Sequence, residues 1–316
     1  MKSNPFVLHK PILHTVYPLR LGMVFRFLTQ FTCLIAVVVC GLGGGILRAD
    51  DGYRAWLRYD PLDQLSQRQA WTAVASGYIC REDDPSVQVA LEELKSGLGG
   101  LLGIEPEVRP EVSGSGGVLI GTIDGNPEIA VRLRPDDADQ IGSEGYVVRT
   151  YANGNGKPLV MVAARSGIGV LYGVFDLLRQ VQTGVYPYGL DRIDQPKIGL
   201  RMLNHWDNLN RTVERGYAGF SLWEWFELPD YISPRYRDYA RLCASVGINA
   251  SVLTNVNANA VILTEPYLEK VAALADVFRP YGVRVYLTAR FSAPMEIGGL
   301  ETADPLDPLV AGWWKQ

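Results

Sequence analysis

The sequence contains little cysteine and histidine, and beyond its first 49 residues acidic side chains outnumber basic ones. Of its four cysteines only Cys80 and Cys243 lie beyond residue 49, which excludes a disulfide framework and leaves no zinc-ligand spacing. His205 is the one histidine of residues 50–316. A multi-histidine metal site and a histidine-paired nucleophile elsewhere in this region are therefore excluded.

Charge is distributed unevenly along the 316 residues. Residues 1–49 contain five basic side chains and no acidic one, whereas residues 50–316 carry a net charge of −9. A surface that binds nucleic acid needs a clustered positive patch, so we expect no nucleic-acid partner. With 47% apolar and 20% charged residues the composition is that of a globular protein, and the length suggests two domains.

Residues 1–49 have the pattern of a secretory signal. Arg20 and Arg26 precede an apolar stretch, and Ala49 is a small residue at a suitable cleavage point before Asp50. We expect export, to the periplasm or the medium, with no stable membrane insertion after cleavage. The alternative is a retained membrane anchor, because the 21 uncharged residues 27–47 are long enough to cross a bilayer of about 30 Å.

Residues 50–195 predict one mixed α/β domain. An amphipathic helix pattern begins near Val87, and we expect it to end at the glycines Gly97, Gly99 and Gly100. Three short apolar runs predict strands: Gly117–Thr122, 145–151 and 158–164. The apolar face of Gly167–Gln182 predicts a helix that covers their sheet, and residues 183–196 have the composition of a linker.

Residues 196–316 alternate strand and helix patterns. The predicted order is strand 199–203, helix 234–246, strand 248–253, helix 265–281 and strand 283–287. This alternation is typical of a parallel sheet, whose ligand sites lie at the carboxyl ends of the strands. The polar clusters after the three strands, at 205–208, 254–257 and 288–291, are therefore the expected site.

The cluster after the first of these strands is the densest polar and aromatic group. Trp206 beside Asp207 and Asn208 suits stacking on the C–H face of a sugar, whose hydroxyls need polar partners. The alternatives are a core tryptophan and a His205 that is simply hydrogen-bonded within the fold. Asn255, Asn257 and the aromatic residues of the next loop favour a carbohydrate-binding cleft: Tyr217, Phe220, Trp223, Trp225 and Phe226.

Several carboxylates are candidates for acid and base chemistry: Asp207, Glu214, Glu224, Glu227, Asp304 and Asp307. Glycoside hydrolysis needs two carboxyl groups at a defined separation, which sequence spacing alone does not provide. Asp304 and Asp307 precede a predicted helix near Pro308, where an N-cap acid is expected.

A glycine-rich turn at 167–173 follows a predicted strand and opens a helix, as in a dinucleotide-binding fingerprint. The fingerprint also needs a second strand that ends in an acid about 20 residues on, and that stretch is rich in turn formers. We therefore interpret the glycines as a tight turn with close helix-to-sheet packing. A nucleotide-dependent oxidoreductase is the alternative.

Longer motifs follow one another from residue 51 to the end of the chain: 52–59, 203–208, 213–219 with 221–223, 247–258, 270–282, 298–308 and 313–315. Together they resemble the xylan-degrading α-glucuronidases of glycoside hydrolase family 67. The resemblance implies an N-terminal α/β domain over 50–195, like that of family 20 hexosaminidases. It further implies that residues 196–316 form the first three strands of a (β/α)₈ TIM barrel.

The same resemblance implies an enzyme that removes α-1,2-linked glucuronic acid, or its 4-O-methyl ether, from xylooligosaccharides. The reaction inverts the configuration and uses no metal or cofactor. Trp206 would stack on the glucuronic acid, and Val256 would line the pocket of the 4-O-methyl group, because a valine suits a methyl better than a hydroxyl. His205, Asp207 and Asn255 complete the predicted substrate-binding set.

The family's general acid, its base carboxylates, its uronate-binding basic residues and its dimerisation domain are expected beyond residue 316. We therefore expect no catalytic residue within the chain, and no activity from the 316 residues alone, although the full-length family forms homodimers. The 121 residues after residue 195 are about half of the roughly 250 that a barrel takes. The alternative function is an exported, non-catalytic carbohydrate-binding or vestigial product.

Overall fold

The computed structural model describes residues 51–112, 116–152 and 157–315. The predicted secretory signal and its anchor alternative lie outside these ranges. Two compact units divide the chain, Met1–Arg54 and Ala55–Gln316, and every element described below belongs to the second. Among the described residues no helix is both long and apolar enough to span a bilayer.

A six-stranded mixed sheet forms the first half of the second unit. Its strand order is β2-β1-β3-β5-β4-β6, with β2, β1, β3 and β5 parallel and β4 antiparallel to both of its neighbours. The strands are β1 (Gly77–Ile79), β2 (Glu107–Val108), β3 (Gly117–Thr122), β4 (Tyr146–Tyr151), β5 (Leu159–Ala164) and β6 (Asp191–Asp194). The three strands predicted from apolar runs are confirmed within a residue.

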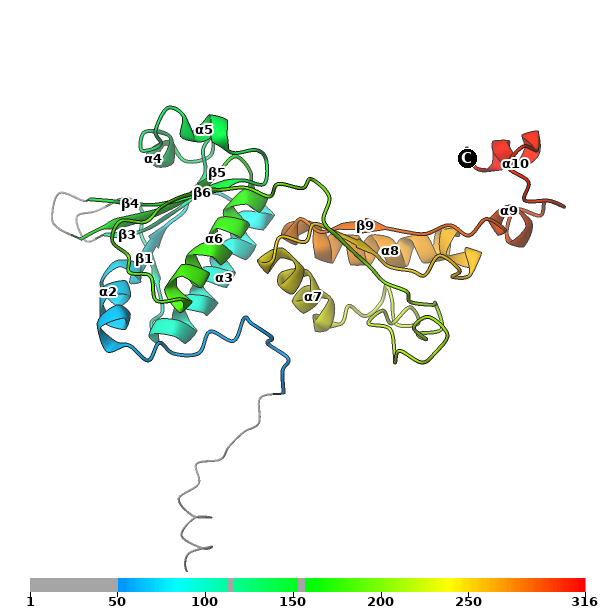
Figure 1. The fold of residues 1–316 in the computed structure, drawn as a ribbon, viewed down its shortest axis with the longest axis horizontal. Coiled ribbons are helices and arrows are strands. Elements are labelled where there is room, and N and C mark those ends of the chain that lie inside the picture. Colours follow the sequence, from blue (N-terminus) through cyan, green and yellow to red (C-terminus); the bar gives the residue numbers. More distant parts are fainter. Residues whose placement is uncertain (1–50, 113–115, 153–156, 316) are drawn as a thin grey trace, which may run out of the picture. The chain divides into compact units, whose positions relative to one another are not determined.

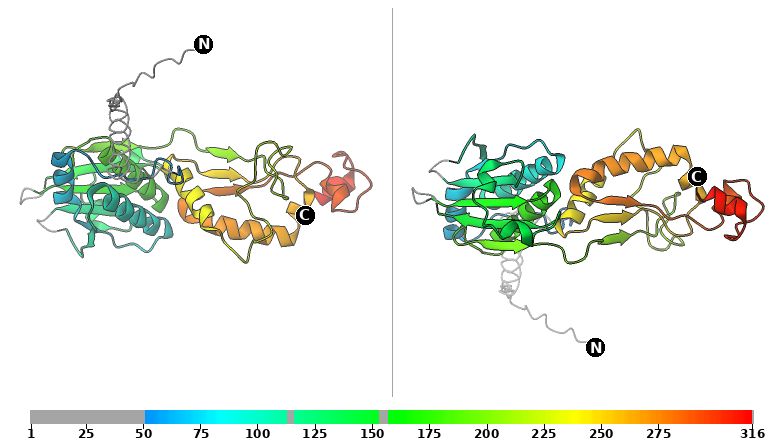
Figure 2. Two further views of the ribbon diagram at one scale, coloured as in Figure 1. Left: turned by 90° about the horizontal axis from the view of Figure 1, so that it is seen from below. Right: turned by 90° about the horizontal axis from the view of Figure 1, so that it is seen from above.

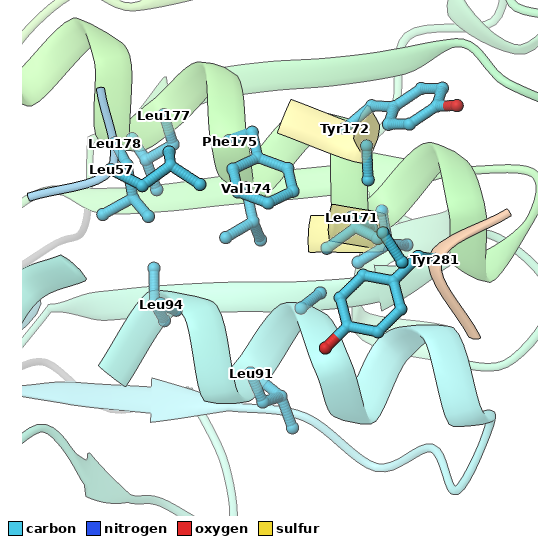
Figure 3. Close-up of a cluster of buried hydrophobic side chains, with 14 of the residues drawn as sticks. Leu57, Leu91, Leu94, Leu171, Tyr172, Val174, Phe175, Leu177, Leu178 and Tyr281 are labelled. Carbon is cyan, nitrogen blue, oxygen red and sulfur yellow. The ribbon is translucent and has the colours of Figure 1, made fainter. Parts of the chain in front are cut away.

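Three helices pack on this sheet: α2 (Leu65–Ala75), α3 (Pro85–Leu102) and α6 (Gly167–Gln182). Figure 1 shows α3 and α6 side by side on one face of the sheet. Leu91 and Leu94 of α3 belong to the same cluster of buried side chains as Leu171, Val174 and Leu178 of α6 (Figure 3). Burying these side chains is the main stabilising contribution of this layer.

The other face of the sheet is covered by two single-turn helices, α4 (Pro127–Ala130) and α5 (Asp137–Gln140). Ile129 and Ile141 pack there against Leu119 and Val147. The domain therefore has two layers of side-chain packing, one on each face of the sheet, as an α/β architecture requires.

A separate three-stranded parallel sheet follows, in the order β7-β8-β9. Its elements are β7 (Met202–Asn204), α7 (Pro234–Ser245), β8 (Ala250–Val252), η1 (Ala260–Leu263), α8 (Glu265–Phe278), η2 (Arg279–Tyr281), β9 (Arg284–Tyr286), α9 (Ala293–Glu296) and α10 (Pro308–Trp313). The predicted alternation of strand and helix is confirmed. Figure 2 shows the strands side by side, with α8 running along them.

Two predictions about the first domain are wrong. Gly97, Gly99 and Gly100 lie inside α3, which ends only at Leu102; Gly103 is its C-cap, with the left-handed φ of 69° that suits this position. Gly97 and Gly100 serve close packing instead, because an added Cβ would lie 2.5 Å from Leu178 and 2.3 Å from the Tyr59 carbonyl oxygen. Residues 183–196, predicted to be a linker, contain the edge strand β6.

Candidate functional site

The loops that follow β7 and β8 are joined by backbone hydrogen bonds. The His205 amide donates to the Val252 carbonyl at 3.0 Å, and the Asn255 amide donates to the Asp207 carbonyl at 2.9 Å. The Thr288 hydroxyl, after β9, donates to the Asn255 carbonyl at 2.8 Å. The three predicted polar clusters are therefore brought together at one end of the parallel sheet, as its topology requires.

Trp206 and Val256 are the two predicted site residues that present apolar surface to solvent. Trp206 is 46% exposed and Val256 is 50% exposed. The Trp206 carbonyl accepts a hydrogen bond from the Glu214 amide at 2.7 Å, so the backbone that carries the indole is held on both sides. Each of the two residues thus presents apolar surface of the kind that suits the C–H face of a sugar, on neighbouring loops.

Asp207 and Asn255 are buried, and their side chains accept hydrogen bonds that hold the two loops in place. Asp207 is 4% exposed, and its Oδ2 accepts a 2.5 Å hydrogen bond from the Ser221 hydroxyl. The Asn255 side-chain oxygen accepts from the Asn257 amide at 2.8 Å, which closes a tight turn at Val256. These contacts fix the positions of Trp206 and Val256 rather than leaving either polar side chain free.

His205 is largely buried within an aromatic group. Its Nε2 lies 2.8 Å from the Tyr239 hydroxyl, which lies 2.8 Å from the Ser251 hydroxyl, and its ring meets the Trp223 ring edge-on at 5.2 Å. Burial lowers the pKa of the imidazole, against the opposing effect of Asp207, whose Oδ1 lies 3.9 Å from Nδ1. A neutral, hydrogen-bonded imidazole results, as the alternative interpretation of this residue anticipated.

Glu214 lies directly beside Trp206 and carries two unusual features. Its backbone adopts a left-handed φ of 53°, which is costly for a residue with a Cβ. Its Oε2 is buried with no hydrogen-bond partner among the described residues, and its Oε1 lies 3.7 Å from Nε of the exposed Arg215. A sheltered, unpaired carboxylate oxygen held in a strained loop is the kind of group that functional sites contain.

The other candidate carboxylates have structural partners or are exposed. Glu224 pairs with Arg211 at 2.6 Å, and Glu227 is exposed. Asp304 and Asp307 accept hydrogen bonds from amides that follow them, and Asp307 is the N-cap of α10, so the capping prediction is confirmed. Among the six candidates, only Glu214 has a sheltered and unpaired carboxylate oxygen.

The aromatic loop is divided between core and surface. Trp223 and Trp225 are fully buried, so their predicted place in an open cleft is wrong: they pack against Tyr236, Phe278 and Tyr267. Tyr217, Phe220 and Phe226 are exposed as expected. Loop composition alone does not distinguish the two groups, because the burial of Trp223 and Trp225 depends on their contacts with α7 and α8, which are distant in sequence.

A hollow of about 420 Å³ lies beside these loops. Its lining includes the predicted Asn208, Asn257 and Phe226 together with Tyr267 and Arg290, which the sequence analysis did not single out. Arg290 lies in the polar cluster after β9, and its position there was the available signal. No group of three or more potential metal ligands occurs in the described part of the chain.

The glycines at the start of α6 allow neighbouring segments to pack closely against the helix. A Cβ on Gly167 would lie 2.1 Å from the Asp84 carboxylate, and one on Gly169 would lie 2.5 Å from the Gly145 carbonyl oxygen. The Asp84 carboxylate thus lies where a pyrophosphate would have to approach the helix. In addition, a dinucleotide-binding fold needs the strand after the helix to lie parallel beside the strand before it. Here β6 pairs antiparallel with β4 and does not adjoin β5, so the dinucleotide-binding alternative is not supported.

Comparison with known protein families shows that the chain is similar to glycoside hydrolases. The chain matches the models of the glycosyl hydrolase family 67 N-terminus over residues 55–177 and of the glycosyl hydrolase family 67 middle domain over residues 180–316. Both describe hydrolases of glycosidic bonds, and together they leave only two residues between 55 and 316 unmatched. The chain belongs to glycoside hydrolase family 67.

Fungal relatives are identical to it at about a third of the aligned positions. "Probable alpha-glucuronidase A" of Aspergillus oryzae is 33% identical over 271 residues, which are 84% of this chain and 31% of that protein. The protein of the same name from Aspergillus terreus is 34% identical over 286 residues, 88% of this chain and 32% of its own length. The chain therefore spans about a third of the length of the curated relatives it matches.

A solved structure shares the fold at low sequence identity. It is described as a family GH115 4-O-methyl-α-glucuronidase with specificity for decorated arabinogalactans. The match has a TM-score of 0.51 at 14% identity and covers 76% of this chain and 33% of that one. The mixed α/β fold with largely parallel sheets is thus shared with a glycosidase.

Proposed function

We propose that the chain forms the sugar-binding side of an α-glucuronidase that removes α-1,2-linked glucuronic acid, or its 4-O-methyl ether, from xylooligosaccharides. The relatives named α-glucuronidase support this proposal. The observation that carries it is the pair Trp206 and Val256, half-exposed on adjoining loops at the carboxyl ends of β7 and β8. In this proposal β7, β8 and β9 are the first strands of a (β/α)₈ barrel, preceded by a domain like that of family 20 hexosaminidases.

Each exposed residue has a distinct proposed role. The Trp206 indole stacks on the C–H face of the uronic acid ring, and the Val256 methyls contact the 4-O-methyl group. A contact with one methyl-sized group contributes about 1 kcal/mol, so the methylated sugar binds only several-fold better than the unmethylated one. Asp207 and Asn255 act by holding these two loops.

Turnover by residues 1–316 alone is not expected under this proposal. Inverting hydrolysis needs one carboxylic acid and one carboxylate on opposite sides of the scissile bond. Among the candidate carboxylates only Glu214 has a buried oxygen without a hydrogen bond, and a second carboxyl group is required. The proposed contribution of these residues is therefore substrate recognition.

The test uses the 316-residue chain and 4-O-methylglucuronic acid in calorimetric titrations. Binding that falls at least tenfold in Trp206→Ala, and that is unchanged in Trp314→Ala, a comparably exposed tryptophan outside the strand-end loops, supports the proposal. Equal binding by the wild type and Trp206→Ala contradicts it. Release of 4-O-methylglucuronic acid from aldouronic acids by this chain alone contradicts the assignment of recognition without turnover.

We also propose export through residues 1–49, since a xylan-derived substrate is met outside the cell. N-terminal sequencing of the mature protein tests this: a first residue near Asp50 supports cleavage, and a first residue upstream of Phe27 contradicts it. A protein retained in membranes would instead support the anchor alternative.

A further inference from the structure

Trp206 lies between two side chains that are anchored on the side of the sheet covered by α7. The His205 amide continues the strand ladder by donating to the Val252 carbonyl at 3.0 Å, and successive side chains of an extended segment alternate between the two faces of a sheet. The His205 imidazole reaches the Tyr239 hydroxyl on α7, and Asp207 Oδ1 lies 3.9 Å from the same imidazole. Trp206, which is 46% exposed, therefore lies on the opposite side.

A chain of two hydroxyl groups fixes the position of His205. The Tyr239 hydroxyl lies 2.8 Å from the His205 Nε2 and 2.8 Å from the hydroxyl of Ser251, a fully buried residue of β8. The Tyr239 ring packs against the rings of Trp223 and Phe278, at centroid distances of 5.2 and 5.6 Å. The phenol is thus held on all sides, and its hydroxyl connects α7 and β8 to the loop that carries Trp206.

The charge of Asp207 determines the direction of these hydrogen bonds. A neutral imidazole has one N–H donor and one acceptor nitrogen. Nδ1 faces the Asp207 carboxylate, which favours the proton on Nδ1 and leaves Nε2 as the acceptor. Burial raises the pKa of Tyr239, so its hydroxyl stays protonated and can donate to Nε2. Ser251 then donates to the phenolic oxygen, and both hydroxyl hydrogens have an acceptor.

We propose that Tyr239 is a positioning residue of the sugar site. By donating to the His205 Nε2 it holds His205, and through the adjoining peptide the Trp206 indole, in the orientation that stacks on a uronic acid ring. Tyr239 and His205 act through Trp206 and not by contact with the sugar: they order the stacking surface in advance, which lowers the entropic cost of binding. This inference rests on the proposed function, because it concerns the affinity of Trp206 for sugar.

Calorimetric titration with 4-O-methylglucuronic acid compares two phenylalanine variants of α7 in the 316-residue chain. Tyr239→Phe should weaken binding about fivefold, the effect of losing one hydrogen bond. Tyr236→Phe is the matched control. Tyr236 is also buried on α7, but its hydroxyl accepts from the Glu224 amide at 2.9 Å, so this variant loses a comparable hydrogen bond and should leave binding unchanged.

The nitrogen NMR spectrum of protein labelled at histidine provides a readout that a loss of stability alone does not move. The His205 signals are those missing from the spectrum of His205→Gln. Burial lowers the pKa of the imidazole, so at neutral pH we expect a protonated Nδ1 and an unprotonated Nε2 whose signal is shifted by the hydrogen bond that it accepts. Tyr239→Phe should move the Nε2 signal towards that of an unbonded nitrogen, and Tyr236→Phe should leave it in place.

Three results overturn the inference: a protonated Nε2 in the neutral wild-type imidazole, undiminished binding by Tyr239→Phe, or equal losses of binding in Tyr239→Phe and Tyr236→Phe. Failure of the proposed function is distinguishable from these. A wild type that binds no uronic acid contradicts the proposed function itself, whereas wild-type binding that Tyr239→Phe leaves intact contradicts only the role of Tyr239.

Discussion

A buried ion pair between β4 and the short helix α5 shows how single residues stabilise this fold. Arg149 and Asp137 are each 2% exposed. The Arg149 guanidinium donates hydrogen bonds to both carboxylate oxygens of Asp137, and its Nε donates to Asp191 at 2.7 Å. The Arg134 amide also donates to Asp137, at 2.9 Å. Two desolvated charges are tolerated here because nearly every donor and acceptor is paired.

Replacing one partner of this pair should be strongly destabilising. We expect Asp137→Asn to lower the free energy of unfolding by about 3 kcal/mol, because the buried Arg149 charge loses its buried counterion and keeps only the half-exposed Asp191. Urea unfolding at pH 7 measures the loss. Asp139→Asn, an exposed acid on the same short helix, is the matched control and should change stability by less than about 0.5 kcal/mol.

The same pair gives stability a defined dependence on pH. The Arg149 guanidinium lowers the pKa of Asp137 in the folded protein, so protonation favours the unfolded chain. The contribution is complete above the unfolded aspartate pKa of about 3.9 and is lost as the pH falls further towards the folded value. Between pH 6 and pH 3 the wild type should therefore lose more stability than Asp137→Asn, and equal slopes in urea titrations would refute this.

At the scale of elements, α3 shows that glycine has different effects at neighbouring positions of one helix. Gly100 meets the Tyr59 backbone, whereas a Cβ on Gly99 would lie 3.6 Å from the Ile104 carbonyl oxygen, an ordinary contact. Both residues are helical, so glycine destabilises the helix at each position through its loss of conformational entropy on folding. Only at Gly100 does close packing compensate for it.

Alanine substitutions at these two positions should have opposite effects. Gly99→Ala should stabilise the protein by about 0.5–1 kcal/mol through helix propensity. Gly100→Ala should destabilise it by about 1–3 kcal/mol, because the new methyl overlaps a backbone carbonyl that cannot move without its segment. Thermal unfolding of the two variants decides this, and matching shifts in the same direction would contradict the packing argument.

The elements differ in how far the sequence predicts them. The helix Gly167–Gln182 is predicted to the residue, because its apolar face is continuous; in the structure Ser166 caps its N-terminus by accepting a hydrogen bond from the Gly169 amide. The strand β6 escapes prediction because Asp191 and Asp194 flank a single apolar residue at a sheet edge. For the site, strand order predicts that Trp206 and Val256 lie together, but the burial of Trp223 and Trp225 depends on long-range packing that no local pattern encodes.

At the scale of the whole second unit, the two sheets share one continuous core. Buried residues of α3 and α6 belong to the same hydrophobic cluster as Phe278 and Val283 of the parallel sheet layer. An ion pair reinforces the junction: Arg241 of α7 donates to both oxygens of Glu93 of α3, at 2.6 and 2.8 Å, and the Tyr59 hydroxyl donates to the same carboxylate. Residues far apart in the chain are therefore coupled in stability.

Breaking this junction should affect the unit as a whole. We expect Arg241→Met to lower the free energy of unfolding by about 3–5 kcal/mol, since Glu93 is buried and loses its counterion. Calorimetry should show a single transition in the wild type. Arg235→Met, an exposed arginine on the same helix, should leave the transition in place, and an Arg241→Met protein that melts at the wild-type temperature would contradict the coupling.

The loop that follows β7 is held by hydrogen bonds across its own segments, and this affects the rate at which a ligand can associate with it. Bridges join Asp207 to Val213 and Thr212 to Phe220, the Ser221 amide donates to the Arg211 carbonyl, and Asn208 donates to the Glu214 carbonyl. A segment held by so many hydrogen bonds has little conformational freedom left to lose when a ligand binds. A ligand that stacks on Trp206 then needs no slow rearrangement, so its association should proceed in one fast phase.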